Sequence, residues 1–357
     1  MSEQLKIKSV FREYSVDFVD DYFATLKQEW RDGDFLVIDQ TISGLHPELK
    51  KITGENFWLV DNGEDSKSYH GVMPLFERLI EGGFRKNHRL IAIGGGITQD
   101  VAAFIASILY RGVEWLFFPT NVLTQCDSCI GSKTSINFKQ FKNQLGGFYP
   151  PSAVYIDTHF ATTLGEREIA SGLGEMLHYF LVSSEADLDL FYKHASNVRN
   201  GGEGLEVLMH RSLEIKKAMI ELDEFDQGPR NVFNYGHSFG HALESATDYA
   251  IPHGTAVSYG IDLANLLSVH LGLLPMAERN RIRPACELVF KGAPLPEIDL
   301  ERYFTALRKD KKNIGSQLGL ILTRGVGDMF KQLCGFDEGI KQVIQTYFEN
   351  KLYLSDQ

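Results

Sequence analysis

The feature that most constrains the fold is the alternation of short apolar runs with amphipathic segments over about the first 155 residues. The apolar runs lie at 35–40, 57–61, 89–94 and 115–120. Segments with helical spacing of apolar residues lie between them, at 73–84 and 99–112. Strands that alternate with helices predict βαβ units and therefore a parallel sheet. The N-terminal stretch 6–18 alternates polar and apolar residues, which predicts further strand structure.

The pattern changes after the apolar run 154–158, where helix-like segments become dominant. They lie at 166–182, 205–225, 237–249 and 256–273, followed by a tail through Asn350. A chain of 357 residues has room for about two domains. We therefore expect an α/β, Rossmann-like parallel-sheet domain over 1–158 and a mainly α-helical domain over 159–357.

Composition excludes several classes of protein. The chain has 36 Lys+Arg against 47 Asp+Glu, a net charge of −11, and 43% hydrophobic residues. This composition argues against disorder, and the acidic balance argues against nucleic acid as the main partner. No secretory h-region is visible at the start, and the most apolar stretch, 90–110, contains three consecutive glycines and Asp100. We expect a soluble, cytoplasmic protein with no membrane partner.

Four cysteines are too few for a disulfide framework. Cys126 and Cys129 form a single CxxC pair, and a zinc ribbon would need a second pair. The pair is either a redox site or, as we prefer, two small buried residues.

The first candidate site is the glycine run that follows the apolar run 89–94. Gly95 and Gly96 precede a helical segment that contains Asp100. Backbone amides at such a turn can approach an anion at the helix N-terminus, although a tight turn needs the same glycines. The run is not the GxGxxG fingerprint of dinucleotide-binding folds. Asp39, at the end of an earlier strand, would suit a ribose hydroxyl or a helix cap.

The second candidate is the segment 118–151, which is dense in glycines, hydroxyls and cations. It contains Asp127, Lys133, Lys142 and Asn143. Lysines on glycine-rich loops suit phosphate recognition, so we prefer a binding segment to a solvated polar loop.

The third candidate is a metal site. His237 and His241 stand at i and i+4 on one helix face, His253 follows in a Pro-His-Gly turn, and Glu175 lies upstream in a helical segment. Two or three imidazoles with one carboxylate form a zinc-type site with an open position. Spacing alone favours His237 and His241 as the ligand pair, against the alternative of capping or core histidines.

Together these residues resemble the 3-dehydroquinate synthase family of sugar-phosphate cyclases. The resemblance covers roughly residues 35–325 and rests on the ordered motifs GGGITQD, CDSCIGSKTSIN, KNQLGGFYPP, GLGEM, RNVFNYGHSFGHALE, HGTAVSYG and RKDKK. It implies an NAD-binding domain, a helical domain and a divalent metal, zinc or cobalt. It also implies a phosphorylated sugar acid as substrate and a homodimer.

The resemblance assigns the site residues in four groups. The metal ligands are Glu175, His237 and His253, which moves His241 from the metal to the substrate phosphate. NAD contacts fall on Asp39, Glu64, Lys67, Gly95, Gly96, Asp100, Thr120, Asn121 and Thr163. Catalytic positions fall on Lys133, His178, Lys216, Arg230, Asn234 and His241, with Lys216 and Arg230 holding the substrate carboxylate. Further substrate contacts fall on Arg111, Asp127, Lys142, Asn143, Lys311 and Lys312, with Arg111 acting across the dimer interface.

The implied reaction is oxidation by NAD, phosphate elimination, reduction and intramolecular aldol closure, so that NAD ends unchanged. His178 departs from the pattern, since the family has a lysine three residues after the metal glutamate. Asn121 and Ser132 replace a threonine and a glycine. Arg230 favours an acidic substrate over sedoheptulose 7-phosphate, which has no carboxylate. The alternatives are another sugar-phosphate cyclase, a metal-dependent alcohol or glycerol-phosphate dehydrogenase, and a non-catalytic NAD-binding protein.

Overall fold

The computed structural model describes residues 4–139, 141–198 and 202–349. Its contacts divide the chain into two compact units. Unit 1 comprises residues 1–163 and 217–225, and unit 2 comprises 164–216 and 226–357. No helix among the described residues is long and apolar enough to cross a membrane.

Unit 1 is built on a seven-stranded sheet in which only the β1–β2 pair is antiparallel. The predicted parallel sheet is thereby confirmed. The strands, in spatial order, are β1 (Leu5–Lys8), β2 (Glu13–Phe18), β9 (Ala153–Ile156), β6 (Glu114–Pro119), β5 (Arg89–Gly94), β3 (Phe35–Asp39) and β4 (Phe57–Val60).

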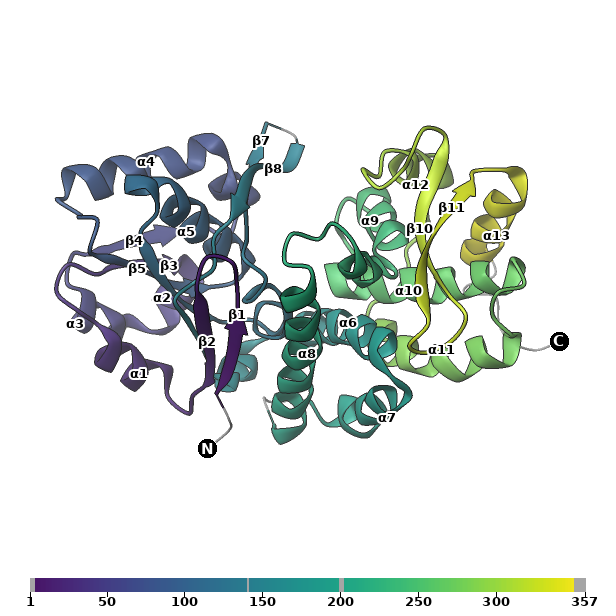
Figure 1. Ribbon diagram of the computed structural model, residues 1–357, viewed down its shortest axis with the longest axis horizontal. Helices are drawn as coiled ribbons and strands as arrows, with labels where there is room; N and C mark the ends of the chain where they lie inside the picture. Colours follow the sequence, from purple (N-terminus) through teal and green to yellow (C-terminus); the bar gives the residue numbers. More distant parts are fainter. Residues whose placement is uncertain (1–3, 140, 199–201, 350–357) are drawn as a thin grey trace. The chain divides into compact units, whose positions relative to one another are not determined.

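Helices cover both faces of this sheet, with α4 and α5 on one side and α1 and α3 on the other (Figure 1). They are α1 (Tyr22–Glu29), α2 (Gln40–Leu45), α3 (Lys50–Thr53), α4 (Tyr69–Glu81) and α5 (Gly96–Ile108). All six residues of β5 are buried, as the central strand of a doubly covered parallel sheet requires.

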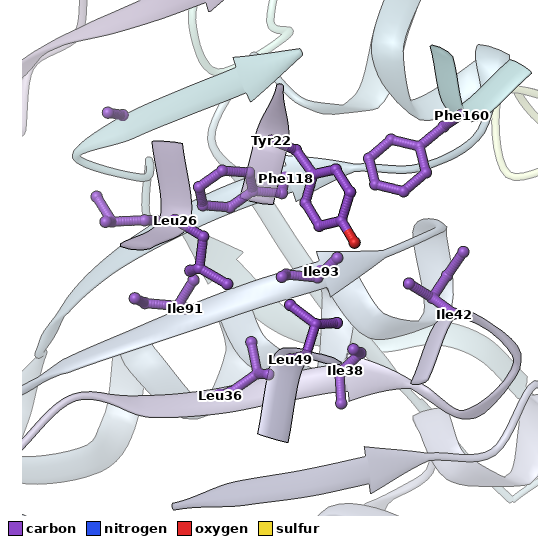
Figure 2. Packing of buried hydrophobic residues seen from close by; sticks show 12 residues of the cluster. Tyr22, Leu26, Leu36, Ile38, Ile42, Leu49, Ile91, Ile93, Phe118 and Phe160 are labelled. Carbon is purple, nitrogen blue, oxygen red and sulfur yellow. The ribbon is translucent and has the colours of Figure 1, made fainter. Parts of the chain in front are cut away.

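Alternate residues of the central strands build the core on one face of the sheet. Ile91 and Ile93 of β5 lie beside Leu36 and Ile38 of β3, and Leu26 of α1 packs over them (Figure 2). Only alternate residues of a strand enter this core, because successive side chains of a strand point to opposite faces. Chain order reverses between β3 and β5, since β4 extends the sheet on one side and β6 on the other. Ligands of such sheets bind outside the carboxyl ends of the strands at this switch point.

Unit 2 is mainly helical, as predicted. Its helices are α6 (Glu166–Ser183), α7 (Glu185–His194), the first part of α8 (Glu203–Leu222), α9 (His237–Ala246), α10 (His253–His270), α11 (Met276–Phe290), α12 (Leu300–Arg308) and α13 (Glu338–Glu349). Asn350, where the predicted tail ends, lies outside the described residues. The unit also contains an antiparallel hairpin of β10 (Gln317–Thr323) and β11 (Met329–Gly335) that the helical prediction did not include (Figure 1).

Candidate active site

Helices α6 and α10 of unit 2 touch backbone to backbone at two glycines. A Cβ added to Gly174 would lie 2.0 Å from the carbonyl oxygen of Gly254, and one added to Gly254 would lie 1.7 Å from that of Ser171. Any side chain at these positions would push the helices apart. The Ser171 hydroxyl also accepts a hydrogen bond of 3.0 Å from the Gly254 amide. Glu175 and His253, the neighbours of these glycines in sequence, are therefore held on facing helices.

A similar contact joins α9 to α10. Gly236 caps the N-terminus of α9 in the left-handed conformation (φ 79°), which favours glycine. A Cβ on Gly260 would lie 2.0 Å from the Gly236 carbonyl oxygen. His237, the first residue of α9, is fixed by this close approach.

Three potential metal ligands meet where α6, α9 and α10 converge. The carboxylate of Glu175 lies 3.4 Å from Nε2 of His237 and 3.4 Å from Nε2 of His253. The ligand atoms of these three residues all lie within 4.8 Å of one another. Glu175 is buried and the two histidines are half-buried. Unit 2 alone therefore brings these three predicted residues together.

The outer nitrogen of each imidazole faces an acceptor. His237 Nδ1 lies 3.2 Å from the carbonyl oxygen of Tyr235, and His253 Nδ1 lies 3.2 Å from a carboxylate oxygen of Glu244. Because these partners only accept, we assign the proton of each neutral ring to Nδ1 and the lone pair to Nε2. Both lone pairs then point toward the Glu175 carboxylate, whose oxygens also carry lone pairs. A cation between the three groups would be coordinated by all of them.

The charge state of Glu175 fits a metal ligand. Burial alone would raise its pKa, but the positive charge that the imidazoles of His237, His178 and His253 carry when protonated outweighs burial, and the net pKa is lowered. When a divalent cation takes the place of the imidazole protons, the ionised carboxylate and two neutral imidazoles form a donor set typical of zinc, with a position open for substrate. The residues present therefore fit a divalent cation of this kind.

Two further histidines lie next to the three ligand candidates. The ring of His178 lies 5.1 Å from that of His237, and its Nδ1 lies 3.8 Å from Glu175. His178 is buried against Phe233, at a ring separation of 5.9 Å. His241 is exposed, and its ring stacks on that of His253 at 5.6 Å. His241 also belongs to a second potential ligand group, with Glu244 and His253.

The remaining predicted residues of unit 2 differ in exposure. Lys216 on α8 and Arg230 are buried, with 5% of each residue exposed. Asn234 ends the 3₁₀ segment Pro229–Asn234 just before the histidine pair. Of the two predicted lysines after α12, Lys311 is exposed, whereas Lys312 forms an ion pair of 3.0 Å with Asp310.

In unit 1, the glycine run lies where the sheet topology favours a ligand. Gly95 is the N-cap of α5 and Gly96 its first residue, directly after β5. The N-terminus of this 13-residue helix offers backbone amides and a partial positive charge to an anion. Asp39 ends β3, beside β5, and one of its carboxylate oxygens accepts hydrogen bonds from the amides of Thr41 and Ile42. Asp39 is thus a helix cap, which was one of the two interpretations of its position.

Several predicted NAD contacts surround α5. Lys67 and Asp100 form an ion pair of 2.5 Å, and burial raises the pKa of Asp100 even though Lys67 opposes the shift. Thr120, directly after β6, is buried, and its amide donates to the Gly94 carbonyl. Asn121 accepts a hydrogen bond from the Thr124 amide. These residues border the strand ends where the glycine run begins.

The described part of the segment 118–151 contains a short helix and two paired strands. Asp127 lies in the π-helix Thr124–Ser128, and Lys133 begins β7 (Lys133–Phe138), which pairs with β8 (Phe141–Phe148). Asn143 on β8 has a positive φ of 56°, and its amide donates to the side chain of Asn137. Asn137 in turn donates to Glu64, which lies 3.8 Å from Lys142.

Two predicted residues of unit 1 lie on other segments. Arg111 is exposed after α5 with a φ of 63°, and Thr163 ends the 3₁₀ segment Thr158–Thr163. Cys126 and Cys129 are both buried and form no disulfide, which matches the preferred interpretation of the pair as small buried residues.

Sequence reasoning missed Glu244, the partner of His253. It stands seven residues after His237 and three after His241, which is the spacing of one helix face. That spacing could have identified Glu244 from the sequence as a neighbour of the histidines.

Sequence profiles described as "3-dehydroquinate synthase N-terminal" and "3-dehydroquinate synthase C-terminal" match residues 57–171 and 172–313. The chain belongs to the 3-dehydroquinate synthase family. It is 37% identical to a 3-dehydroquinate synthase of Halorhodospira halophila, covering 83% of this chain and 85% of that protein. It is 32% identical to the enzyme of Shewanella pealeana, covering 96% and 99%.

Solved structures show the same architecture. A 2-epi-5-epi-valiolone synthase from Streptomyces hygroscopicus subsp. jinggangensis 5008, with NAD+ and Zn2+ bound, is 26% identical, with a TM-score of 0.83 over 98% of this chain and 99% of that one. A 2-deoxy-scyllo-inosose synthase complexed with carbaglucose-6-phosphate, NAD+ and Co2+ has a TM-score of 0.86 at 22% identity, over 98% and 100%. The expected fold class is confirmed.

Proposed function

We propose that this chain is an NAD- and divalent-metal-dependent 3-dehydroquinate synthase. It would convert 3-deoxy-D-arabino-heptulosonate 7-phosphate into 3-dehydroquinate and phosphate. The observation that carries the proposal is the arrangement of Glu175, His237 and His253, in which the Nε2 atom of each histidine lies 3.4 Å from the Glu175 carboxylate. Membership in the 3-dehydroquinate synthase family supports the same reaction class.

The two cofactors would divide between the two units. Glu175, His237 and His253 would hold zinc or cobalt, which supplies a Lewis acid for a substrate hydroxyl when bound. NAD would lie at the glycine run of unit 1 and supply a reversible hydride acceptor. Its contacts are proposed to be Asp39, Glu64, Lys67, Gly95, Gly96, Asp100, Thr120, Asn121 and Thr163.

The chain's own side chains would bind and orient the substrate. Lys216 and Arg230 are buried cations, and both can bind a substrate carboxylate through charge-assisted hydrogen bonds. Lys133, Asn143 and His241 are proposed to contact the phosphate and hydroxyls. The remaining contacts are assigned to Arg111, Asp127, Lys142, His178, Asn234, Lys311 and Lys312. Their shared task is to hold one molecule through several steps in reactive geometry.

A phosphate-release assay tests the substrate. The metal-loaded protein with NAD is incubated with 3-deoxy-D-arabino-heptulosonate 7-phosphate and, separately, with sedoheptulose 7-phosphate. We expect release from the first compound. Release from sedoheptulose 7-phosphate alone would assign the chain to another sugar-phosphate cyclase activity. This activity is the second candidate because His178 stands where the family has a lysine.

Two variants test the metal site and the contact with the substrate carboxylate independently. Glu175→Gln should abolish phosphate release from any substrate, because an amide is a poor replacement for the anionic ligand. Arg230→Met should impair only a substrate that carries a carboxylate. Equal activity of Glu175→Gln and wild type would exclude the proposed metal site.

Absorbance of NADH separates a cyclase from a dehydrogenase or a non-catalytic NAD-binding protein. A cyclase returns the hydride within each turnover, so phosphate should accumulate without NADH. Stoichiometric NADH would indicate a dehydrogenase. Absence of both products would indicate a binding protein.

We also propose that the chain acts as a cytoplasmic homodimer. The resemblance that gives Arg111 a role across an interface supports the dimer, and four free, buried cysteines fit a reducing compartment. Light scattering on the purified protein tests the dimer. A monomer that retains full phosphate release would exclude a role for Arg111 across the interface.

A further inference from the structure

We propose that Glu244 is a positioning residue for the metal site and acts through His253. This inference rests on the proposed metal site formed by Glu175, His237 and His253. Glu244 lies on α9, whereas His253 begins α10, so the pair joins two of the three helices that supply ligands.

The geometry of the His253 ring supports this role. Nδ1 lies 3.2 and 3.3 Å from the two carboxylate oxygens of Glu244, and Nε2 lies 3.4 Å from Glu175 on the other side. The ring thus has one carboxylate at each nitrogen. A proton on Nδ1 donates to Glu244 and leaves the Nε2 lone pair aimed at the ligand cluster.

Burial makes this contact more effective than a surface pair. Only 13% of the Glu244 side chain and 32% of the His253 side chain are exposed. His237 is oriented differently, by the backbone carbonyl of Tyr235. His253 is therefore the ligand candidate whose orientation depends on a replaceable side chain. Removing such an outer partner from a metal-bound histidine typically lowers metal affinity about 10- to 100-fold.

Glu244 also belongs to the second potential ligand group, with His241 and His253. The two assignments make different predictions for glutamine. If Glu244 orients His253, the amide oxygen of Glu244→Gln can still accept the Nδ1 proton, and most of the affinity remains. If Glu244 is itself a ligand, Glu244→Gln should lose metal as completely as Glu175→Gln.

The experiment measures Zn2+ and Co2+ affinity by chelator competition, together with the visible absorption of the Co2+-loaded protein. The variants are Glu244→Ala, Glu244→Gln and Glu175→Gln. The control is Glu214→Gln on α8, outside the ligand cluster, where Glu214 lies 3.6 Å from Nδ1 of His210 and forms an ion pair of 2.9 Å with Arg211. Thermal unfolding of each metal-free protein measures effects on the fold alone.

We expect the Kd for metal to rise about 10- to 100-fold in Glu244→Ala and much less in Glu244→Gln, with Glu214→Gln unchanged. The metal-free Tm should be the same for Glu244→Ala and Glu214→Gln. An unchanged Kd in Glu244→Ala would overturn the inference, and so would a loss in Glu244→Gln equal to that of Glu175→Gln. A metal-free Tm that falls enough to account for weaker binding in Glu244→Ala would indicate a structural role instead. If Glu175→Gln binds metal like wild type, the proposed metal site itself is wrong.

Discussion

Replacing Gly174 by alanine tests whether backbone contact between α6 and α10 builds the ligand cluster. The new Cβ would lie 2.0 Å from the Gly254 carbonyl oxygen, whereas ordinary contact begins near 3.4 Å. The helices must therefore separate locally by about 1.4 Å. Because Glu175 and His253 adjoin the two glycines, much of this movement should reach the ligands.

The expected effect on metal binding is larger than the effect on stability. Overpacking costs about 1–3 kcal/mol, and the better helix propensity of alanine offsets about 0.5–1 kcal/mol of it. The net loss of unfolding free energy should be about 0–2.5 kcal/mol. Metal sites tolerate ligand displacements of only about 0.2 Å, so the Kd for Zn2+ or Co2+ should rise more than about 100-fold.

Chelator competition measures the Kd, and urea unfolding of the metal-free protein measures the stability. The matched control is Gly44→Ala on α2, where an added Cβ meets no heavy atom within 4 Å. It should leave metal binding unchanged and stabilise the protein by up to about 1 kcal/mol. Wild-type metal affinity in Gly174→Ala would refute the argument that this contact positions Glu175.

Three further predictions concern stability, each measured by urea unfolding. Burial alone would raise the pKa of Asp187, but hydrogen bonds from Arg211 outweigh burial and lower it. The stabilisation from this carboxylate is present above the unfolded pKa of about 4 and is lost as pH falls below it. Asp187→Asn should therefore lose about 1–2 kcal/mol at pH 7 and converge with wild type in acid. Arg279→Met leaves Asp262 buried without its 2.9 Å partner and should cost about 3–5 kcal/mol, whereas a loss below about 1 kcal/mol would contradict a strong pair. Ile93→Ala in the fully buried sheet core should cost about 2–5 kcal/mol, and a smaller loss would mean that the core closes over the cavity.

The fold was largely predictable because its signals are local. The periodicity of apolar residues marked β3, β5 and α5, and a glycine run after a buried strand marked the turn between β5 and α5. The hairpin of β10 and β11 was not predicted. Pairing between strands is a tertiary interaction, and the neighbouring segments have helical patterns.

The cluster of candidate metal ligands was only partly predictable. Spacing alone favoured His237 and His241, since i and i+4 lie on one helix face, and the resemblance replaced His241 by His253. In the structure, Nε2 atoms of His237 and His253 both face Glu175, whereas the ring of His241 stacks on His253. Sequence spacing gives a shared helix face but not the direction of a ring nitrogen.

Local residue order and composition were enough to predict the alternation of strands and helices and the acidic balance, because these properties depend on neighbouring residues or on residue counts. The resemblance to the family supplied the candidate ligands Glu175, His237 and His253. The backbone contact at Gly174 and Gly254, and the position of Glu244 at the outer nitrogen of His253, emerged only from the folded structure. Both depend on contacts between separate helices, where a shift of an ångström separates ligand atoms that can share a cation from ligand atoms that cannot.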